Sequence, residues 1–257
     1  QQELERCDRT MQRDLSWSEL DCTIQNKLFG ELIMAVAMDD LDSLKLFERD
    51  GVDLNFEWRL IHGGLLYWAI SNQASEVVHY LIENKAADPN LTANGGPNPL
   101  VRLINNRSNV NYPLLEYLLQ NGARPNHGGE EYSDASYPLT TAASNNDLES
   151  VKILLNHHAN PNLYESTPPL MMAANHGNEQ MVDLLLRFGA NPNQGINGLS
   201  CGDIDDGLKS DLFVMDSAQK NGNSRVVKIL NQVGAKTTQQ CFRRPTGLEP
   251  SSPASVY

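Results

Sequence analysis

Five residues at 198–202 form the part of the sequence most suggestive of covalent chemistry. They read Gly-Leu-Ser-Cys-Gly and match G-x-S-x-G, the pattern around the nucleophile of many serine hydrolases. That pattern works on a sharp turn between a buried strand and a helix, beside backbone donors for an oxyanion. Here it follows the turn-rich stretch GANPNQGIN and precedes an aspartate-rich segment, so no surrounding parallel sheet is predicted. A hydrolase that uses Ser200 or Cys201 is therefore a minor alternative.

Cys201 is also a candidate thiol nucleophile, with His157, His158 or His176 as the base. A reactive thiol needs electropositive surroundings that stabilise the thiolate, whereas the segment at 203–211 carries four aspartates. The four cysteines of the chain lie far apart and include no C-x-x-C pair. The sequence therefore predicts neither a disulfide framework nor a zinc site, and a reducing compartment is expected.

Motifs for metal, phosphate and cofactor binding are not found in the sequence. The segment DIDDG at 203–207 lacks the spacing and the distant Glu of a calcium-binding EF-hand loop. The six histidines show no H-E-x-x-H pattern, and the glycine pairs fall in predicted turns. We therefore predict no metal, no cofactor and no enzymatic activity.

The charge balance bears on the class of partner. The 257-residue chain carries a formal net charge of −12, which argues against binding to nucleic-acid phosphates and favours a basic or neutral protein partner. No apolar run approaches the roughly 18 residues of a membrane-spanning helix, so no membrane insertion is expected. The first residue is Gln1 rather than Met, which leaves open an upstream segment and any targeting information in it.

The candidate functional side chains are positioned by the helices of an internal sequence repeat. This repeat is clearest between residues 137 and 193. Two copies each begin with Pro-Leu, continue to Ala-Ala, and reach a V-x-x-L-L run after a short polar break. Both copies close with Ala-Asn-Pro-Asn. Self-similarity at this period is typical of a solenoid in which neighbouring units share one core.

The pattern resembles the ankyrin repeat, whose T-P-L-x-x-A opener appears here as YPLTTA at 137–142 and PPLMMA at 168–173. This resemblance implies an all-α solenoid of helix-turn-helix repeats joined by β-hairpin fingers. Pro at the start of a helix fits, because that N–H has no intrahelical partner. Gly189 is expected to end a helix in the left-handed conformation, a place that His158 takes in the other copy.

About six repeats are predicted from the alignment of the V-x-x-L-L positions. The last aligned position is apolar in the four middle repeats and polar at the two ends, as Glu48 and Asn231. Terminal repeats must face water on one side, so this is the change that a stack of repeats requires. Residues 1–27 are expected to form an N-terminal capping region with a helix from about residue 17, and residues 237–257 a disordered tail. The predicted array spans 28–236, with repeats near 31–55, 65–90, 98–126, 137–162, 168–193 and 214–236.

The predicted fingers carry two further hypotheses. The fifth finger, 194–212, is the longest and is acidic, so we expect either a binding loop or a mobile segment. Asparagines that close the predicted hairpins, Asn90, Asn126, Asn162 and Asn193, match positions that an asparaginyl hydroxylase modifies in some ankyrin proteins. Their simpler predicted role is hydrogen bonding within the turn.

The resemblance also implies a scaffold that binds proteins with its first helices and its fingers. The two residues after each Ala-Ala pair are predicted to point into the concave groove, and Asn recurs there although it is a poor helix former. Aromatic finger residues are predicted to anchor the partner. The complete set of predicted protein-binding residues is Trp58, Asn72, Asn105, Asn106, Tyr132, Tyr137, Ser144, Asn145, Tyr164, Asn175, His176, Lys220 and Asn221.

Our prediction is a monomeric, non-enzymatic interaction scaffold in the cytoplasm, with a protein partner that the sequence does not name. The Asn-rich style is similar to that of ankyrin effectors that intracellular bacteria deliver into host cells, which would place the protein in the host cytoplasm after secretion. The alternative is an adaptor whose residues 1–30 bind a ubiquitin-ligase scaffold.

Overall fold

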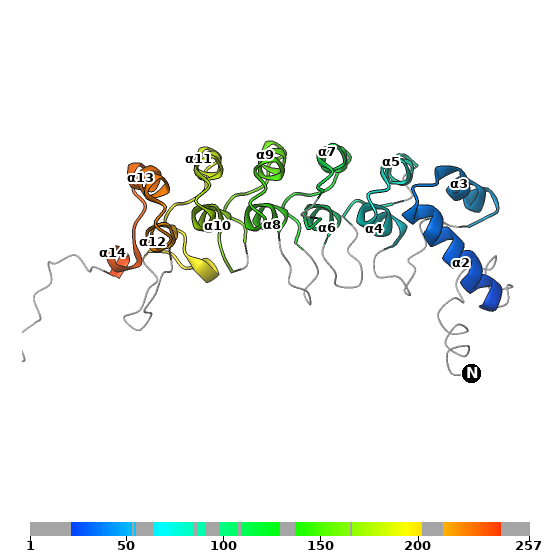
Figure 1. Ribbon diagram of the computed structural model, residues 1–257, viewed down its shortest axis with the longest axis horizontal. Helices are drawn as coiled ribbons and strands as arrows, with labels where there is room; N and C mark the ends of the chain where they lie inside the picture. Colours follow the sequence, from blue (N-terminus) through cyan, green and yellow to red (C-terminus); the bar gives the residue numbers. More distant parts are fainter. Residues whose placement is uncertain are drawn as a thin grey trace, which may run out of the picture. The chain divides into compact units, whose positions relative to one another are not determined.

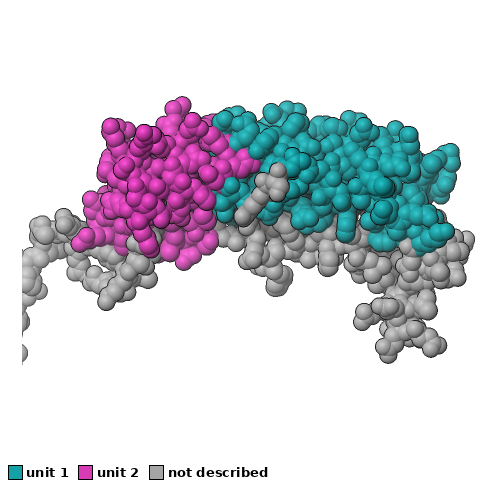
Figure 2. Space-filling view, viewed as in Figure 1, with its two compact units in different colours: residues 1–145, 149–159 teal, residues 146–148, 160–257 magenta. Residues whose placement is uncertain are grey.

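Helices make up most of the structure, a computed structural model, and they follow one another in pairs (Figure 1). Two compact units are distinguished (Figure 2): unit 1 comprises residues 1–145 and 149–159, and unit 2 comprises residues 146–148 and 160–257. The residues that the structure describes are 22–52, 54, 64–84, 87–90, 98–106, 109–128, 137–164, 166–201 and 213–242.

Unit 1 contains four helix pairs in its described residues. They are α2 (Cys22–Ala37) with α3 (Leu41–Arg49), α4 (Gly64–Ser71) with α5 (Ser75–Glu83), α6 (Pro99–Ile104) with α7 (Tyr112–Gln120), and α8 (Pro138–Ser144) with α9 (Leu148–Asn156). The first helices contact one another in the order α2, α4, α6 and α8. Within this unit the first helices form one layer and the second helices another (Figure 1).

Unit 2 contains two helix pairs and a short terminal helix. They are α10 (Pro169–His176) with α11 (Glu179–Arg187), and α12 (Val214–Lys220) with α13 (Ser224–Gln232), followed by α14 (Thr238–Phe242). A 3₁₀ turn, η1 (Ile196–Gly198), lies between the two pairs in sequence. α10 contacts α12 and α11 contacts α13, so this unit also has layers of first and second helices.

Local residues explain where many of the helices begin. Pro99, Pro138 and Pro169 each stand at the first helical position, where a missing N–H costs nothing. Asn98 and Asn178 cap their helices through side-chain oxygens, which accept from backbone N–H groups at 2.9 and 3.0 Å. Asn178 thus shows that the polar break before the V-x-x-L-L run supplies the cap of the second helix.

Left-handed residues make the turns inside and after the helix pairs. The turn within a pair contains a residue of positive φ, as in Gln73 (φ 59°) and Gly177 (φ 67°). His158 (φ 67°) and Gly189 (φ 87°) occupy the corresponding positions after α9 and α11, as predicted. The conformation reverses the chain within a few residues, so the two helices of a pair can pack on each other.

The core lies between the two helix layers of each unit. The V-x-x-L-L register is confirmed in its central part, because Val151, Leu154, Val182 and Leu185 are all fully buried. At the two ends of the alignment, Glu48 and Asn231 are exposed. These polar residues keep the terminal helix pairs compatible with water.

The β-hairpin fingers are not found in the described residues. These contain no strand, only one isolated antiparallel bridge between Gln194 and Ser200. Most of the predicted finger residues lie outside the described part of the chain, including Trp58, Tyr132 and 202–212.

The helices at the two ends of the array do not coincide with the predicted boundaries. α2 runs without interruption from Cys22 through the proposed boundary at 27–28, while residues 1–21 lie outside the described part. The tail prediction is wrong for its first residues, because α14 occupies Thr238–Phe242. The Pro- and Ser-rich composition beyond Phe242 obscured this short helix, which depends on contacts with the rest of unit 2 rather than on its own propensity.

Candidate functional site

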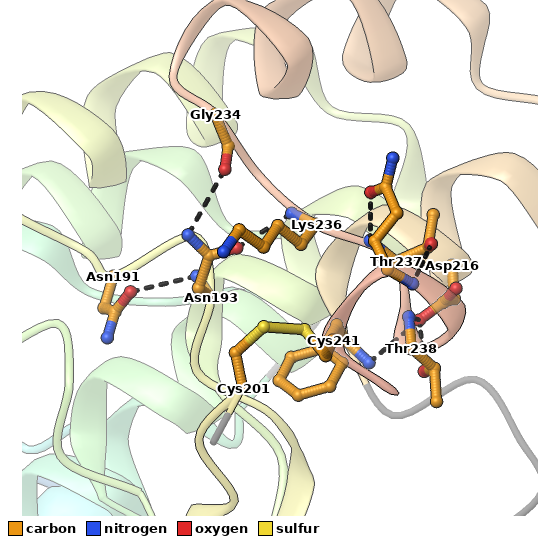
Figure 3. Close-up of a disulfide and its surroundings, with 11 residues drawn as sticks. Asn191, Asn193, Cys201, Asp216, Gly234, Lys236, Thr237, Thr238 and Cys241 are labelled. Carbon is orange, nitrogen blue, oxygen red and sulfur yellow. Dashed lines mark hydrogen bonds between the residues drawn. A yellow bond between two sulfur atoms is a disulfide. The ribbon is translucent and has the colours of Figure 1, made fainter. Parts of the chain in front are cut away.

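A disulfide joins Cys201 to Cys241 in unit 2 (Figure 3), although the sequence predicted none. The two Cα atoms are 4.9 Å apart, and 40 residues separate the cysteines in sequence. Cys201 follows η1, whereas Cys241 lies in α14. Because its sulfur is bonded, Cys201 has no thiolate with which to attack a substrate. This finding argues directly against the thiol-nucleophile hypothesis.

Ser200, the other proposed nucleophile, lies in the short bridge with Gln194. Within this turn the Gly195 N–H donates to the Leu199 carbonyl at 2.7 Å. A nucleophile elbow needs a strand that leads directly into a helix, and residue 200 is instead preceded by a 3₁₀ turn and followed by a disulfide-bonded residue. The local geometry therefore does not match a hydrolase nucleophile.

Tyr164 packs against the start of the fifth finger. Its hydroxyl donates to the Gly195 carbonyl at 2.7 Å, and burial raises the pKa of Tyr164 above its usual value. The Asn197 N–H donates to the Ser166 carbonyl, also at 2.7 Å. These bonds tie residues 194–198 to the segment before α10, so this part of the finger is anchored to unit 2.

Asp216 fastens the terminal helix α14 to α12. Its carboxylate accepts hydrogen bonds from the Thr238 N–H at 2.8 Å and the Thr238 hydroxyl at 2.6 Å. The same carboxylate oxygen accepts from the Phe213 N–H at 3.3 Å. The Phe213 side chain is fully buried. The Asp216 bonds at Thr238 and the disulfide at Cys241 therefore hold α14 near both of its ends (Figure 3).

The asparagines that were predicted to bond within the finger turns also bond the following helix pair. In unit 1, the Asn90 amide donates to the Gly122 carbonyl at 3.0 Å and accepts from the Arg124 N–H at 2.7 Å. The Asn126 amide donates to the His158 carbonyl at 3.0 Å. Each side chain thus connects its own pair to the turn that ends the next second helix.

Unit 2 repeats this arrangement twice. The Asn162 amide donates to the Gly189 carbonyl at 2.9 Å and accepts from the Asn191 N–H at 2.7 Å. Asn193 makes the equivalent pair of bonds with Gly234 and Lys236, at 3.3 and 2.8 Å (Figure 3). These amides have a structural role in the connection of successive repeats. The hydroxylase hypothesis for them is not tested by the geometry.

The residues predicted to point into the groove, here called the amide row, are only partly exposed in unit 1. Asn72 and Asn105 are exposed, whereas Asn106 and Ser144 are half-buried. The expectation that Asn145 faces solvent is wrong. Its side chain is half-buried and donates to the Ile104 carbonyl at 3.1 Å. The C-terminal end of α8 packs close to that of α6, so Asn145 serves as a link between the two helices.

In unit 2, the structure exposes Asn175, His176, Lys220 and Asn221. Two of these side chains bond each other, because the Asn221 amide donates to the Asn175 side-chain oxygen at 3.1 Å. The Ser217 hydroxyl donates to the same oxygen. This network connects α10 to α12. Two of the amides that were predicted to bind a partner are therefore hydrogen-bonded within the protein.

The predicted aromatic anchors are held by the protein itself where the structure describes them. Tyr137 and Tyr164 are half-buried. The Tyr137 ring lies so near Gly128 that a Cβ added there would be 3.2 Å from a ring carbon. Glycine at 128 therefore permits the ring to pack on the backbone. Trp58 and Tyr132 lie outside the described residues.

A cluster on α4 and α6 was not predicted from the sequence. The Arg102 Nε donates to the Ser71 hydroxyl at 2.9 Å, and the guanidinium lies over the Tyr67 ring, 5.7 Å from its centroid. Arg102 is exposed and Tyr67 and Trp68 are half-buried. Leu66 and Leu100 align in the repeat, and Trp68 and Arg102 each stand two positions later. A comparison of residues at this repeat position would therefore have pointed to Arg102. We call Tyr67, Ser71, Asn72, Arg102 and Asn105 the α4–α6 face.

Among the described residues, no group of three His, Cys, Asp or Glu side chains is placed to hold a metal ion. None of the helices in the same part of the chain is both long enough and apolar enough to cross a membrane.

Comparisons with known proteins agree on the fold. The family model for ankyrin repeats (three copies) matches residues 106–196 and 139–241, together more than half of the chain. The chain has no match among curated proteins. It is similar to a chain in the solved structure of the predatory endopeptidase Bd0816 from Bdellovibrio bacteriovorus in complex with the immunity protein Bd3460. That similarity has a TM-score of 0.58 at 21% identity and covers 78% of this chain and 96% of the other. At this identity it indicates a shared fold only.

Proposed function

This chain belongs to the ankyrin repeat family, and we propose that it is a non-enzymatic scaffold that binds a protein partner through the α4–α6 face. Ankyrin repeats are modules of protein interaction. The observation that carries the proposal is the Tyr67–Ser71–Arg102 cluster, in which an exposed guanidinium is oriented by a hydroxyl and a ring. Tyr and Arg are among the residues that dominate binding energy at interfaces.

The surroundings of the cluster suit an extended peptide or loop. Asn72 and Asn105 are exposed beside it, and each amide has both donor and acceptor groups. The Asn72 amide N–H₂ also donates to the Trp68 carbonyl at 2.9 Å, which limits the orientations of the side chain. Side chains that are already oriented lose less entropy on binding. The net charge of −12 favours a basic or neutral partner for the chain as a whole, whereas Arg102 gives this face a local positive charge.

We also propose that the repeat array includes the two helix pairs before the matched residues. Leu44 of α3 and Val78 of α5 occupy the V-x-x-L-L register and are fully buried. The turns within these pairs contain Asp39 and Gln73 at φ 58° and 59°, similar to Asn146 at φ 57°. All six helix pairs would then be ankyrin repeats.

Binding through the α4–α6 face is tested with a partner captured by affinity purification and identified by mass spectrometry. The variant Tyr67→Ala/Arg102→Ala/Asn105→Ala should weaken binding by about tenfold or more and retain its helical circular dichroism. Arg49→Ala is the matched control, because Arg49 is an exposed arginine on α3 outside this face. Equal binding by the triple variant and the control would contradict the proposal.

The disulfide leads us to propose a place of action different from the cytoplasm expected from the sequence. Disulfides persist in oxidising compartments and are rare in reducing ones. The Cys201–Cys241 bond therefore supports secretion, which was part of the effector hypothesis, but favours action outside a reducing cytosol. Non-reducing peptide mapping of the chain from its native source should give a linked pair that contains Cys201 and Cys241. Free thiols at both positions would contradict this proposal.

The adaptor hypothesis depends on residues 1–30, of which 1–21 lie outside the described part. Affinity purification with and without residues 1–21 tests it, because α2 begins at Cys22 and stays intact in the shorter chain. Recovery of a ubiquitin-ligase subunit only with the longer chain would favour the adaptor.

A further inference from the structure

The second helices of unit 2 carry an apolar surface that the proposed function does not use. Leu184 and Phe188 are four residues apart on α11 and its C-terminal end, and Ile229 and Val233 occupy the equivalent positions on α13. Phe188 is 42% exposed and Val233 45% exposed, whereas Leu184 and Ile229 are half-buried. α11 and α13 contact each other (Figure 1), so the four side chains lie on neighbouring helices. We call these four residues the α11–α13 face.

Unit 1 shows that the helix ends do not require apolar residues. Asn84 and Asn121 occupy the C-cap positions of α5 and α7, the same positions that Phe188 and Val233 take in unit 2. Both amides donate to the carbonyl four residues earlier, at 2.8 and 2.9 Å. Phenylalanine and valine cannot make this bond, and their exposure contributes little to folding. Large exposed apolar side chains at adjacent positions instead indicate a recognition surface.

Basic side chains slightly outnumber acidic ones on the two helices of this face, three to two, in contrast to the acidic chain as a whole. α13 contains Arg225 and Lys228 and no acidic residue, and its acidic neighbour Glu179 on α11 is paired with Arg225 at 3.4 Å. On α11, Asp183 is paired with Arg187. Lys228, next to Ile229, is exposed and has no ion-pair partner among the described residues. The unpaired positive charge is complementary to an acidic partner.

We propose that the α11–α13 face is a second docking surface, which binds an acidic amphipathic helix of a partner protein. Apolar residues of that helix, at i, i+3 or i+4 and i+7, would lie against Leu184, Phe188, Ile229 and Val233. Its acidic residues would face Lys228. A helix is the fitting occupant, because rows of side chains on two adjacent helices form the kind of surface into which a third helix packs. The face consists of residues on the second helices of unit 2, whereas the α4–α6 face consists of residues on the first helices of unit 1.

The test uses a phage-displayed library of amphipathic peptides of about 16 residues, long enough to form a helix on binding. Selection is made on the whole chain with its disulfide intact. Enriched peptides are then synthesised with a fluorophore, and their binding is measured by fluorescence anisotropy. The peptides should have an apolar stripe flanked by Asp and Glu. A version of each peptide with Lys in place of Asp and Glu should bind at least about tenfold more weakly.

Three variants locate the binding site. Phe188→Asn/Val233→Asn introduces the residues that unit 1 has at these positions, so folding should be retained while binding falls by about tenfold or more. Lys228→Glu should weaken binding several-fold, with a smaller effect at high salt. Leu46→Asn is the control, because Leu46 is an exposed leucine of unit 1, 48% accessible, and should bind like the unchanged chain.

Several results would overturn this inference. One is an absence of enriched peptides, and another is enrichment of peptides without acidic residues. Undiminished binding by Phe188→Asn/Val233→Asn would place the peptides elsewhere. Concentration-dependent dimerisation that this double variant abolishes would make the occupant a second copy of the chain. The triple variant of the α4–α6 face should still bind the peptides, so failure of the two proposals can be told apart.

Discussion

Asn84 and Asn121 end the second helices α5 and α7 of unit 1, whereas Phe188 and Val233 end α11 and α13 of unit 2. The backbone is the same in both cases, because the N–H of each of these residues bonds to carbonyls of the preceding turn. The fold therefore tolerates polar and apolar residues at this position. It follows that the outer surface of a helix pair can change its recognition properties without a change in architecture.

The two units also differ in the side chains that connect their first helices. In unit 1, Asn145 links α8 to the Ile104 carbonyl, and Arg102 reaches Ser71 with its guanidinium exposed. In unit 2, Asn175 and Asn221 bond each other between α10 and α12. Polar residues on the first helices thus stabilise the array in one place and present donors to solvent in another. Types of residue alone do not separate these roles.

The largest expected effect is the loss of core leucines, which should be the same in both units. Leu154→Ala in α9 and Leu185→Ala in α11 each remove a fully buried side chain. Each should lower the free energy of unfolding by roughly 2–5 kcal/mol. Urea denaturation followed by circular dichroism measures this loss. A loss below about 1 kcal/mol for either variant would show that the corresponding core is not packed as described.

Loss of the disulfide should affect unit 2 selectively. Cys201→Ser opens a loop of 40 residues, and a crosslink of this size contributes about 4 kcal/mol in the chain-entropy model. Hydrogen exchange by mass spectrometry should show faster exchange in α12, α13 and α14 than in the unchanged protein. Exchange in α4 to α7 of unit 1 serves as the internal control and should not change. Equal acceleration in both units would contradict a local role for the bond.

Substitutions at the turn within a helix pair should have opposite effects in the two units. Gly177→Ala in unit 2 should destabilise by about 1–2 kcal/mol, because φ is +67° and the new Cβ would meet the Asn223 side chain at 2.8 Å. Gln73→Gly in unit 1 should be neutral or slightly stabilising, because Gln73 already has φ 59°. Thermal unfolding of the two variants tests the comparison. A more stable Gly177→Ala protein would be incompatible with it.

The smallest effects concern the amide row of unit 1. Asn145→Ala should cost about 1 kcal/mol, because the Ile104 carbonyl loses the hydrogen bond that it accepts at 3.1 Å. Asn105→Ala should stay within about 0.5 kcal/mol, because Asn105 is exposed. Chemical denaturation of both variants beside the unchanged chain makes the comparison. The same cost at both positions would mean that the Asn145 bond contributes nothing measurable.

The helix pairs and their register could be predicted from the sequence, because the signals are local. Pro138 and Pro169 mark helix starts, Asn178 supplies a cap within three residues, and Gly189 ends a helix. The V-x-x-L-L run places Leu154 and Leu185 on the buried side through helical periodicity alone. Each of these features depends on residues within one or two turns, which the linear order already brings together.

Only the tertiary structure decided which distant groups meet. Cys201 meets Cys241, across 40 residues of sequence, on a helix, α14, that Asp216 also bonds to α12. Asn90 bonds the turn of the following pair, at Gly122, in addition to Asp88 in its own turn. Arg102 reaches Ser71 on another helix. Such contacts depend on how successive pairs stack, and a given residue type fits several partners until that stacking brings one of them within bonding distance.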